Sequence, residues 1–277
     1  MLKVIYGTDF HGNITLFKKI LQKAKQGNYK TIIYGGDICP RGMLGLEHSK
    51  EIQNEFLEKL VSLFSDFKKQ NNIEIFLIMG NDDMRINYPI LEKADTNGYI
   101  KLINKKCYIL GKFSIIGYSY VPVTPFRLKD WEKYDDTSKQ ISSRACPLAQ
   151  GIKTAETQEK YDNIEQDLQY LKKLSNPKKT IYVMHSPPYN TALDMMYSRT
   201  HVGSKSIKKF IEKNQPYMTL HGHIHESPMI SGEYMQQIGK TISINPGSSF
   251  INLIKKDTIK IVTMDLEDLG TIKIEDL

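Results

Sequence analysis

Cysteine is scarce in this chain, with three residues among 277. Cys39, Cys107 and Cys146 lie far apart, form no CxxC pair and are too few for a disulfide framework, so we expect a reducing, cytoplasmic location. No apolar run approaches the ~18 residues that a membrane span needs, and no membrane association is predicted. The amino-terminal MLKVIYGTDF leads into polar residues rather than a cleavage site, so we expect no signal peptide.

Repeats and low-complexity tracts are also absent, which excludes repeat architectures and fibrous chains. Hydrophobic residues make up 40% and charged residues 25%, with a mean hydropathy of −0.40, a balance typical of a folded domain. The net charge of +7 favours an anionic, phosphorylated small substrate. Nucleic acid is a possible partner, but no interleaving of aromatic and basic residues indicates it. The sequence does not determine the oligomeric state.

Strands and helices alternate in the first third of the chain, which predicts parallel strands with right-handed crossovers. The predicted elements are strand 3–7, helix 14–26, strand 31–35, helix 51–69 and strand 73–79. Short strands at 99–103, 107–110 and 114–118 then resemble an antiparallel meander. After helix 157–174 the early rhythm returns with strand 180–184, helix 206–213 and strand 217–220, and further short strands end the chain.

We therefore expect one domain over residues 1–277, with a loop or cap insertion at about 122–155. In this segment Phe126, Trp131 and Tyr134 either cover a site or hold the loop as a small satellite core. The segments 122–155 and 186–205 are expected to shape the substrate pocket.

Metal-ligating side chains follow the ends of five predicted strands. The positions are Asp9 and His11, Asp37, Asn81, His185, and His223 with His225. Counting the adjacent His221, five of the seven histidines fall in these segments. Ligands of open α/β sheets bind beyond the carboxyl ends of parallel strands, so we expect these side chains to meet at one edge. Singly, such residues are also ordinary turn and capping residues. Their number and order favour a metal site.

The chemistry of this set is imidazole, carboxylate and amide oxygen without thiolate, which suits Zn, Mn, Fe or Ni. One carboxylate can be shared by two ions, and ions held ~3.5–4 Å apart can activate water and neutralise phosphoryl oxygens. Gly36, Gly80 and Gly222 beside the ligands let the backbone turn sharply and approach closely.

The order Asp9-x-His11, Gly36-Asp37, Gly80-Asn81, His185 and Gly222-His223-x-His225 resembles the calcineurin-like metallophosphoesterase superfamily. The resemblance runs from about Val4 to Gly247. It implies an α/β fold, a four-layer α/β/β/α sandwich of two mixed sheets with flanking helices. The stretches 203–226 and 245–248 are further similar to a bacterial and archaeal branch related to the cyclic-nucleotide phosphodiesterase Icc.

Carried onto this sequence, the resemblance implies that Asp9, His11 and His225 hold a first metal ion. Asn81, His185 and His223 would hold a second. Asp37 would bridge both, together with a hydroxide that attacks phosphorus in line. The implied cofactors are two divalent or trivalent ions, Mn, Fe, Zn or Ni, with Mn favoured.

One position departs from the family pattern. Most members carry histidine after the asparagine, where it contacts phosphate and protonates the leaving group, but this chain has Asp82. A free aspartate has a pKa near ~3.9, and nearby cations favour its anionic form. An anionic Asp82 would donate no proton and would repel phosphate oxygens. A diester carries less negative charge than a monoester dianion, so we predict a phosphodiesterase for a small nucleotide-like or other soluble diester.

Four more polar residues have open roles. His201 is the best candidate for a replacement proton donor, or else an exposed loop residue. Arg41 either binds phosphate or is a plain loop arginine, His221 is predicted to be structural, and Asp83 either orients a neighbour or lies exposed.

Two other functions remain possible at this point, a phosphomonoesterase or protein phosphatase, and a non-catalytic binding scaffold on the same fold. A scaffold without catalytic demand would be expected to lose ligands, and the ligand set here is complete.

Overall fold

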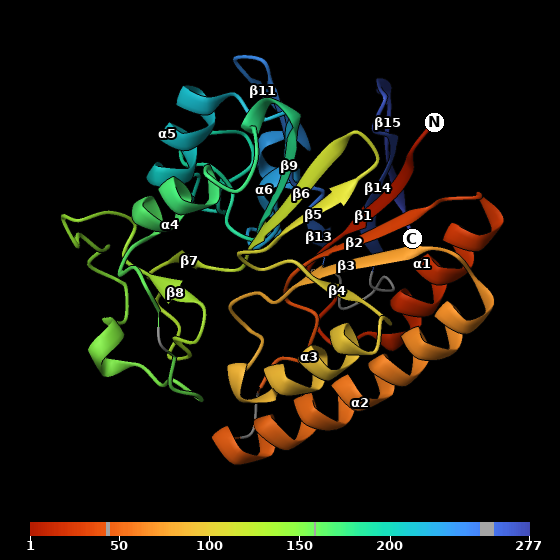
Figure 1. Cartoon of the computed structure of the whole chain (residues 1–277). Helices are drawn as coiled ribbons and strands as arrows, with labels where there is room; N and C mark the ends of the chain where they lie inside the picture. Colours follow the sequence, from red (N-terminus) through yellow and green to blue (C-terminus); the bar gives the residue numbers. More distant parts are fainter. Residues whose placement is uncertain (43–44, 158, 250–257) are drawn as a thin grey trace.

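Two mixed β-sheets stacked face to face form the centre of the computed structural model, which describes residues 1–42, 45–157, 159–249 and 258–277 (Figure 1). The first sheet has the order β13-β14-β1-β2-β3-β4, with β15 adding to β14, over the described residues. Strands β1 to β4 are parallel, and β14 runs antiparallel to β1. The strands are β1 (Lys3–Gly7), β2 (Thr31–Gly35), β3 (Glu74–Ile78), β4 (Lys101–Leu102), β13 (Ser248–Ser249), β14 (Thr258–Asp265) and β15 (Asp268–Asp276).

The second sheet has the order β11-β12-β10-β9-β6-β5. Its four inner strands are parallel, and the edge strands β11 and β5 are antiparallel to their neighbours. The strands are β5 (Cys107–Leu110), β6 (Phe113–Tyr118), β9 (Thr180–Met184), β10 (Met218–Leu220), β11 (Met235–Ile238) and β12 (Thr241–Ile244). The parallel strands of both sheets therefore end toward the same region, where the predicted ligands follow them.

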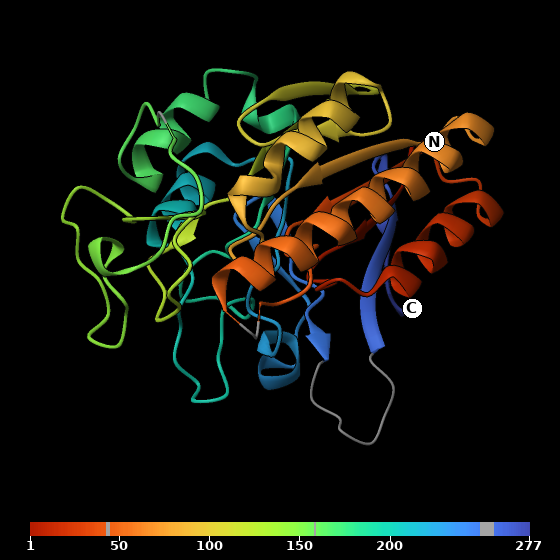
Figure 2. The same cartoon turned by 90° about the horizontal axis from the view of Figure 1, so that it is seen from below.

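Helices cover the outer faces of both sheets. Helices α1, α2 and α3 lie over the sheet that contains β1 to β3, and α4 and α5 lie beside the other sheet (Figures 1 and 2). Side chains cap two of these helices, because Asn163 accepts a hydrogen bond from Gln166 N and Ser204 accepts one from Ile207 N. The helices are α1 (Ile14–Gln26), α2 (Leu46–Gln70), α3 (Tyr88–Thr96), α4 (Ile164–Leu171), α5 (Lys205–Asn214) and α6 (Ser227–Ser231), with 3₁₀ turns η1 (Arg85–Asn87), η2 (Leu148–Gln150) and η3 (Pro177–Lys179).

The layers follow from the alternation of side chains along each strand. On β1, Val4 and Tyr6 belong to the apolar cluster between the sheets, whereas Ile5 belongs to the cluster that includes Phe17 of α1. Both faces of the strand are thus buried, as expected for a parallel strand covered on each side. The Tyr6 hydroxyl also donates to the carbonyl of His221, at 2.8 Å, which links the two sheets just below the candidate site. The predicted α/β/β/α sandwich is confirmed.

Three predictions about elements were wrong. Residues 99–103 do not join an antiparallel meander, because Lys101 and Leu102 pair in parallel with β3 and the chain then crosses to the second sheet. Helix α4 begins at Ile164 rather than residue 157, and α2 begins at Leu46 rather than residue 51. The short strands expected near the end of the chain are present as β11, β12 and β13, and the longer strands β14 and β15 follow them as a hairpin.

The segment 122–155 contains short elements, with β7 (Val121–Pro122) pairing in parallel with β8 (Glu132–Lys133). Its aromatic residues divide between the two expected roles. Trp131 is buried against Tyr88 and Tyr120, with ring centroids 5.7 and 5.5 Å away, so it attaches the segment to the core. Phe126 is 56% exposed and lines the cavity described below.

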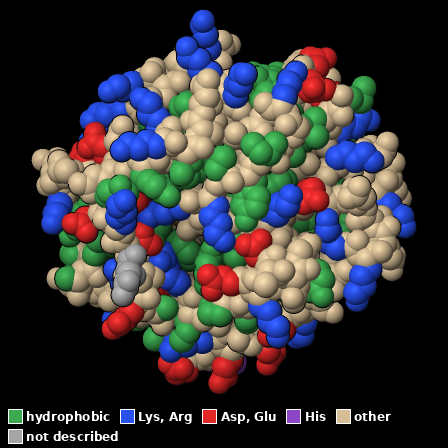
Figure 3. Space-filling view, viewed as in Figure 1, with side chains coloured by type: hydrophobic (Ala, Val, Ile, Leu, Met, Phe, Trp, Pro, Cys, Tyr) green, Lys and Arg blue, Asp and Glu red, His purple; other side chains and the backbone are tan. Residues whose placement is uncertain are grey.

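Lysine and arginine side chains are spread over the face of the molecule seen in Figure 3, with acidic side chains between them. Among the described residues, no helix combines the length and the apolar character needed to cross a bilayer.

Candidate metal centre

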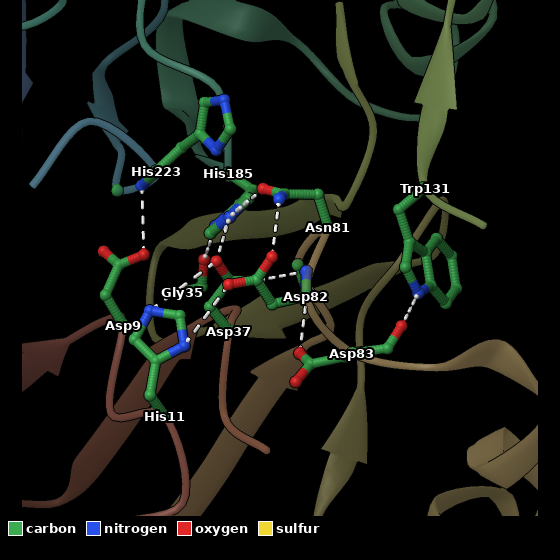
Figure 4. Close-up of polar contacts among 12 residues, drawn as sticks. Asp9, His11, Gly35, Asp37, Asn81, Asp82, Asp83, Trp131, His185 and His223 are labelled. Carbon is green, nitrogen blue, oxygen red and sulfur yellow. Dashed lines mark hydrogen bonds and ion pairs between the residues drawn. The ribbon is translucent and has the colours of Figure 1, made fainter. Parts of the chain in front are cut away.

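The loops that follow β1, β2, β3, β9 and β10 bring all seven predicted ligands together. Figure 4 labels six of them, all except His225. Two groups of side chains have ligand atoms within 4.8 Å of one another. One group contains Asp9, His11, Asp37 and His225, and the other contains Asp37, His185 and His223. Asp37 belongs to both groups, which is the position expected of a carboxylate shared by two ions.

The backbone at these ligands is strained. Asp9, His11, Asp37 and His223 have φ values of 60°, 41°, 50° and 66°, in the left-handed region that side chains rarely adopt. Such conformations persist where the surrounding structure holds them, and they cluster at functional sites. Here the residues that adopt them are the loop residues whose side chains meet in the two clusters.

Asp9 provides the first test of whether a cation fits. Its Oδ1 accepts the backbone N–H of His223 at 3.1 Å and lies 3.1 Å from Nε2 of His225. Its Oδ2 is buried and has no hydrogen-bond partner among the described residues. An unsatisfied buried carboxylate oxygen is costly unless a cation binds it. The donor set at this position therefore fits a metal ion.

His185 is oriented as a ligand by the backbone. Its Nδ1–H donates to the Gly35 carbonyl at 2.8 Å, which leaves Nε2 facing the site. That Nε2 lies 3.3 Å from Asp37 Oδ2 and 3.2 Å from Asn81 Oδ1. Imidazole, carboxylate and amide oxygen thus lie together, and Asn81 and His185 are among the residues that the family resemblance implied for a second ion.

The glycines beside the ligands keep this space open. A Cβ on Gly80 would lie 2.3 Å from Asp37 Oδ1 and 2.6 Å from His185 Nε2. A Cβ on Gly222 would lie 2.5 Å from Asp9 Oδ2. The backbone therefore approaches the ligands closely at both positions, as predicted, and only glycine leaves room for them.

The protonation states at the site depend on burial and on the short distances between aspartate and histidine side chains. Burial lowers the pKa of His11 and of His223 to about 3, so both rings are neutral and keep a lone pair for a metal. Burial disfavours charge on His185 as well, but Asp37 and Asp9 outweigh it and raise its pKa to about 10. Burial would raise the pKa of Asp37, yet His185 and His11 hold it well below its usual range. Asp37 is therefore a carboxylate that attracts positive charge.

Comparison with known proteins agrees with this geometry. The sequence pattern of the family described as calcineurin-like phosphoesterases matches residues 2–227. The chain belongs to this family. It is 37% identical over 266 residues to the uncharacterized protein MJ1162 of Methanocaldococcus jannaschii, a match that covers 93% of this chain and 94% of that protein.

Two solved structures share the fold of this phosphoesterase family member. The protein TT1561 of Thermus thermophilus aligns with a TM-score of 0.61 and 14% identity, over 100% of this chain and 98% of that one. A dimetal phosphatase from Danio rerio aligns with a TM-score of 0.55 and 10% identity, over 95% of each chain. Members of the family depend on two metal ions, and the two clusters that share Asp37 are groups able to hold them.

Asp82 and Arg41 form a pair at the edge of this phosphoesterase site. Arg41 Nε donates to Asp82 Oδ2 at 3.1 Å, and its Nη2 lies 3.2 Å from His11 Nε2. Burial and the nearby Asp37 raise the pKa of Asp82 to about 6, against the opposing effect of Arg41. This pKa is higher than the ordinary value used in the sequence argument, but Asp82 still stays mostly ionised at neutral pH.

Asp83 and His221 support the site from below. Asp83 is buried, and its carboxylate accepts the N–H groups of Ile38, Cys39 and Gly80 at 3.2, 2.7 and 2.8 Å. Asp83 is therefore not exposed but orients its neighbours, because its carboxylate connects the loop that carries Asp37 to the loop that carries Asn81. His221 is buried and hydrogen-bonds to the carbonyls of Met184 and Ser186, as expected of a structural residue.

Sequence reasoning gave no role to Asn245 in the site, although it lies in the stretch 245–248 that marked the finer resemblance. Its Nδ2 donates to the carbonyls of Leu193, Gly222 and Ile224, at 3.0 to 3.3 Å. Asn245 thereby holds the loop that carries His223 and His225. The cue in the sequence was the Asn-Pro-Gly turn signal directly after a strand.

A cavity of about 1290 Å³ opens over the two clusters. Parts of the segments 122–155 and 186–205 line it, as expected, together with Arg41 and Asp82. His201 lies on its wall, and its Nδ1 is 2.7 Å from Oδ1 of the buried Asp194. Asp194 was not predicted, because it follows no strand end and belongs to no motif; only its place seven residues before His201 in the same loop links the two.

Proposed function

We propose that this protein is a phosphodiesterase that depends on two metal ions and hydrolyses a small, soluble, nucleotide-like phosphodiester. The family supports a phosphoric ester hydrolase, and the preference for diesters rests on Asp82. When bound, the two ions would supply Lewis-acid activation of water and charge neutralisation at phosphorus. Asp9, His11, His225 and the shared Asp37 would hold one ion, and Asn81, His185 and His223 would complete the other.

The protein's own side chains select the charge of the substrate. Asp82 presents a mostly ionised carboxylate at the edge of the cavity, beside Arg41. A monoester dianion meets stronger repulsion there than a diester monoanion, because repulsion grows with charge. Arg41 offers guanidinium N–H donors to one non-bridging oxygen, which is the contact that a monoanion needs.

The deciding experiment compares hydrolysis of bis(4-nitrophenyl) phosphate and 4-nitrophenyl phosphate by purified protein with added Mn²⁺. We expect the diester to have the higher kcat/KM. Asp37→Ala is expected to lose both activities by at least about a hundredfold, because it removes the carboxylate shared by both ions. Faster turnover of the monoester would contradict the diester assignment and would favour a phosphomonoesterase.

Asp82→His restores the residue that most family members carry at this position. We expect it to raise the ratio of monoester to diester activity, since it replaces a negative charge with a proton donor. Asp82→Asn is the matched control, because it removes the charge without adding a donor of the same kind. No metal bound and no turnover of either ester would instead support a non-catalytic scaffold.

A further inference from the structure

His201 and Asp194 form a hydrogen-bonded pair on the cavity wall, and neither belongs to the predicted metal ligands. The Nδ1–Oδ1 distance is 2.7 Å, and Asp194 is completely buried. The Asp194 carboxylate also accepts the N–H groups of Asn190, Thr191 and Gly203, at 3.1, 2.9 and 2.9 Å. These bonds fix the carboxylate, which then fixes the plane of the imidazole ring.

This geometry sets which nitrogen exchanges protons. An ionised carboxylate can only accept, so Nδ1 of His201 carries a hydrogen and donates it to Asp194. Nε2 is therefore the atom that can give a proton to a ligand. The side chain of His201 is 24% exposed, and it lines the cavity that opens over the metal clusters.

His201 lies in the cavity where a proton donor for the leaving group is needed, a role that an anionic Asp82 does not fill. His201 lines the same cavity as Asn81, His223 and His225. Charged and titratable groups around it include Tyr189, whose ring centroid is 6.1 Å from that of His201, and Lys205, whose Nζ lies 5.3 Å from the Tyr189 ring. Arg199 and Glu233 line a second pocket that His201 also lines, and Glu226 lines the shared cavity.

We propose that His201 is the general acid of the reaction and that Asp194 is its positioning residue. The proposal rests on the proposed phosphodiesterase function and goes beyond it, because it names the source of the proton for the leaving group. If the pair only stabilised the loop, replacing His201 would have the same effect on the hydrolysis rate whether the leaving group is good or poor.

The step balances as follows for one diester. A water oxygen forms the new bond to phosphorus and loses one proton to solvent. The bond between phosphorus and the leaving oxygen breaks, and that oxygen takes the electron pair. Nε2 of the imidazolium of His201 gives it a proton, which yields an alcohol and a phosphomonoester. The neutral ring keeps its Nδ1–H on Asp194 and regains a proton from solvent.

Leaving-group dependence tests the proposal directly. A nitrophenolate leaves without protonation, whereas an alkoxide needs a proton. The variant His201→Asn keeps an N–H donor near Asp194 but removes Nε2. We expect it to lose on the order of 10²–10⁴-fold in kcat on methyl or nucleoside-alkoxide diesters, and about threefold or less on bis(4-nitrophenyl) phosphate.

Controls separate the possible failures. His48→Asn alters an exposed histidine of α2 and should leave both rates unchanged. Equal slowing of both substrates by His201→Asn, with metal content unchanged, would overturn the role of His201 alone. A wild-type protein that binds two metals and hydrolyses neither diester would overturn the proposed function and, with it, this role.

Asp194→Asn tests the positioning role with a second variant. We expect the alkoxide diester to lose kcat with KM little changed, while the nitrophenyl diester keeps its rate. Added imidazole should partly restore the alkoxide reaction in a His201→Gly variant, which a purely structural histidine would not allow. Loss of the nitrophenyl activity in Asp194→Asn, with normal metal content, would show that Asp194 acts on the site as a whole and would overturn its assignment.

Discussion

At the scale of one residue, the site depends on glycine at position 80, where any side chain would enter the space of the ligands. The Cβ of Gly80→Ala would lie 2.3 Å from Asp37 Oδ1, closer than atoms approach without a shift. We expect this variant to remain folded but to bind fewer than two metal ions per chain, because the shared carboxylate must move. Metal analysis of the purified protein, together with a thermal melt, measures both effects.

Gly270→Ala is the matched control for this change, since a Cβ there meets only the side chain of Asp268, at 3.1 Å. It should bind as much metal as the wild type. Two ions per chain in Gly80→Ala would show that the loop after β3 shifts easily, and the rigid site described here would then be wrong.

Single residues also show what the sequence could and could not predict. The seven ligand positions were predicted because each follows a strand, and strand ends are readable from short apolar runs. The burial of Asp83 was left open, since it depends on three N–H groups from two loops. Asp194 was missed for the same reason: its contact with His201 arises from the path of a loop that has no periodic pattern.

At the scale of elements, a partly buried cluster of charges attaches the segment before α4 to η1, to β8 and to the turn before β5. Glu159 accepts hydrogen bonds from Lys105, from Lys133 Nζ at 3.0 Å and from Arg85 Nη1 at 3.2 Å. Asp167 of α4 accepts from the same two lysines, at 2.8 and 2.7 Å. This cluster explains why α4 starts late, because the residues before it are committed to these contacts.

Glu159→Gln should destabilise the fold in a pH-dependent way. Burial would raise the pKa of Glu159, but Lys105 and Tyr120 outweigh it and hold the pKa well below the ordinary 4.5. The unfolded chain therefore binds the proton more readily, so the contribution of Glu159 is complete above pH 4.5 and lost as the pH falls through the folded-state value. We expect a cost of about 1–3 kcal/mol near neutral pH, reduced from that of a fully buried pair because Glu159 is partly exposed.

Urea unfolding of wild type and Glu159→Gln, at about pH 7 and about pH 3.5, measures this difference. The gap between the two proteins should narrow in acid. A gap that stays constant across this range would mean that the cluster acts through packing rather than charge.

The bounds of strands were predicted well where a local run of apolar residues defines them. Strand pairing was predicted poorly, because it depends on which distant strand lies alongside. Strands β1, β2 and β9 match their predicted bounds because both faces are buried. The error at residues 99–103 came from assuming that close strands pair with each other. Leu102 instead continues the apolar face beside Leu77 of β3, and no local pattern distinguishes that distant partner from the next strand.

The whole molecule places its site where both sheets and the inserted segment meet. Ligands come from strand ends of both sheets, and Trp131 of the segment donates its Nε1–H to the carbonyl of Asp83 at 2.8 Å. The guanidinium of Arg85 lies 3.8 Å from the Trp131 ring centroid. The loop with Asn81 is therefore held by residues from the inserted segment as well as by its own sheet.

Because Trp131 is the only tryptophan of the chain, its fluorescence reports unfolding of this segment alone, whereas far-UV circular dichroism reports both sheets and all helices. Trp131 belongs to the same apolar cluster as residues of β1 and β2 and bonds to the Asp83 loop, so the segment has no core of its own. We expect the two signals to give one superimposable urea transition. A fluorescence transition at lower urea would show that the segment unfolds separately from the two sheets.

Trp131→Phe removes the hydrogen bond to the Asp83 carbonyl. We expect the free energy of unfolding, measured from the dichroism transition in urea, to fall by about 1 kcal/mol, the usual contribution of one buried hydrogen bond.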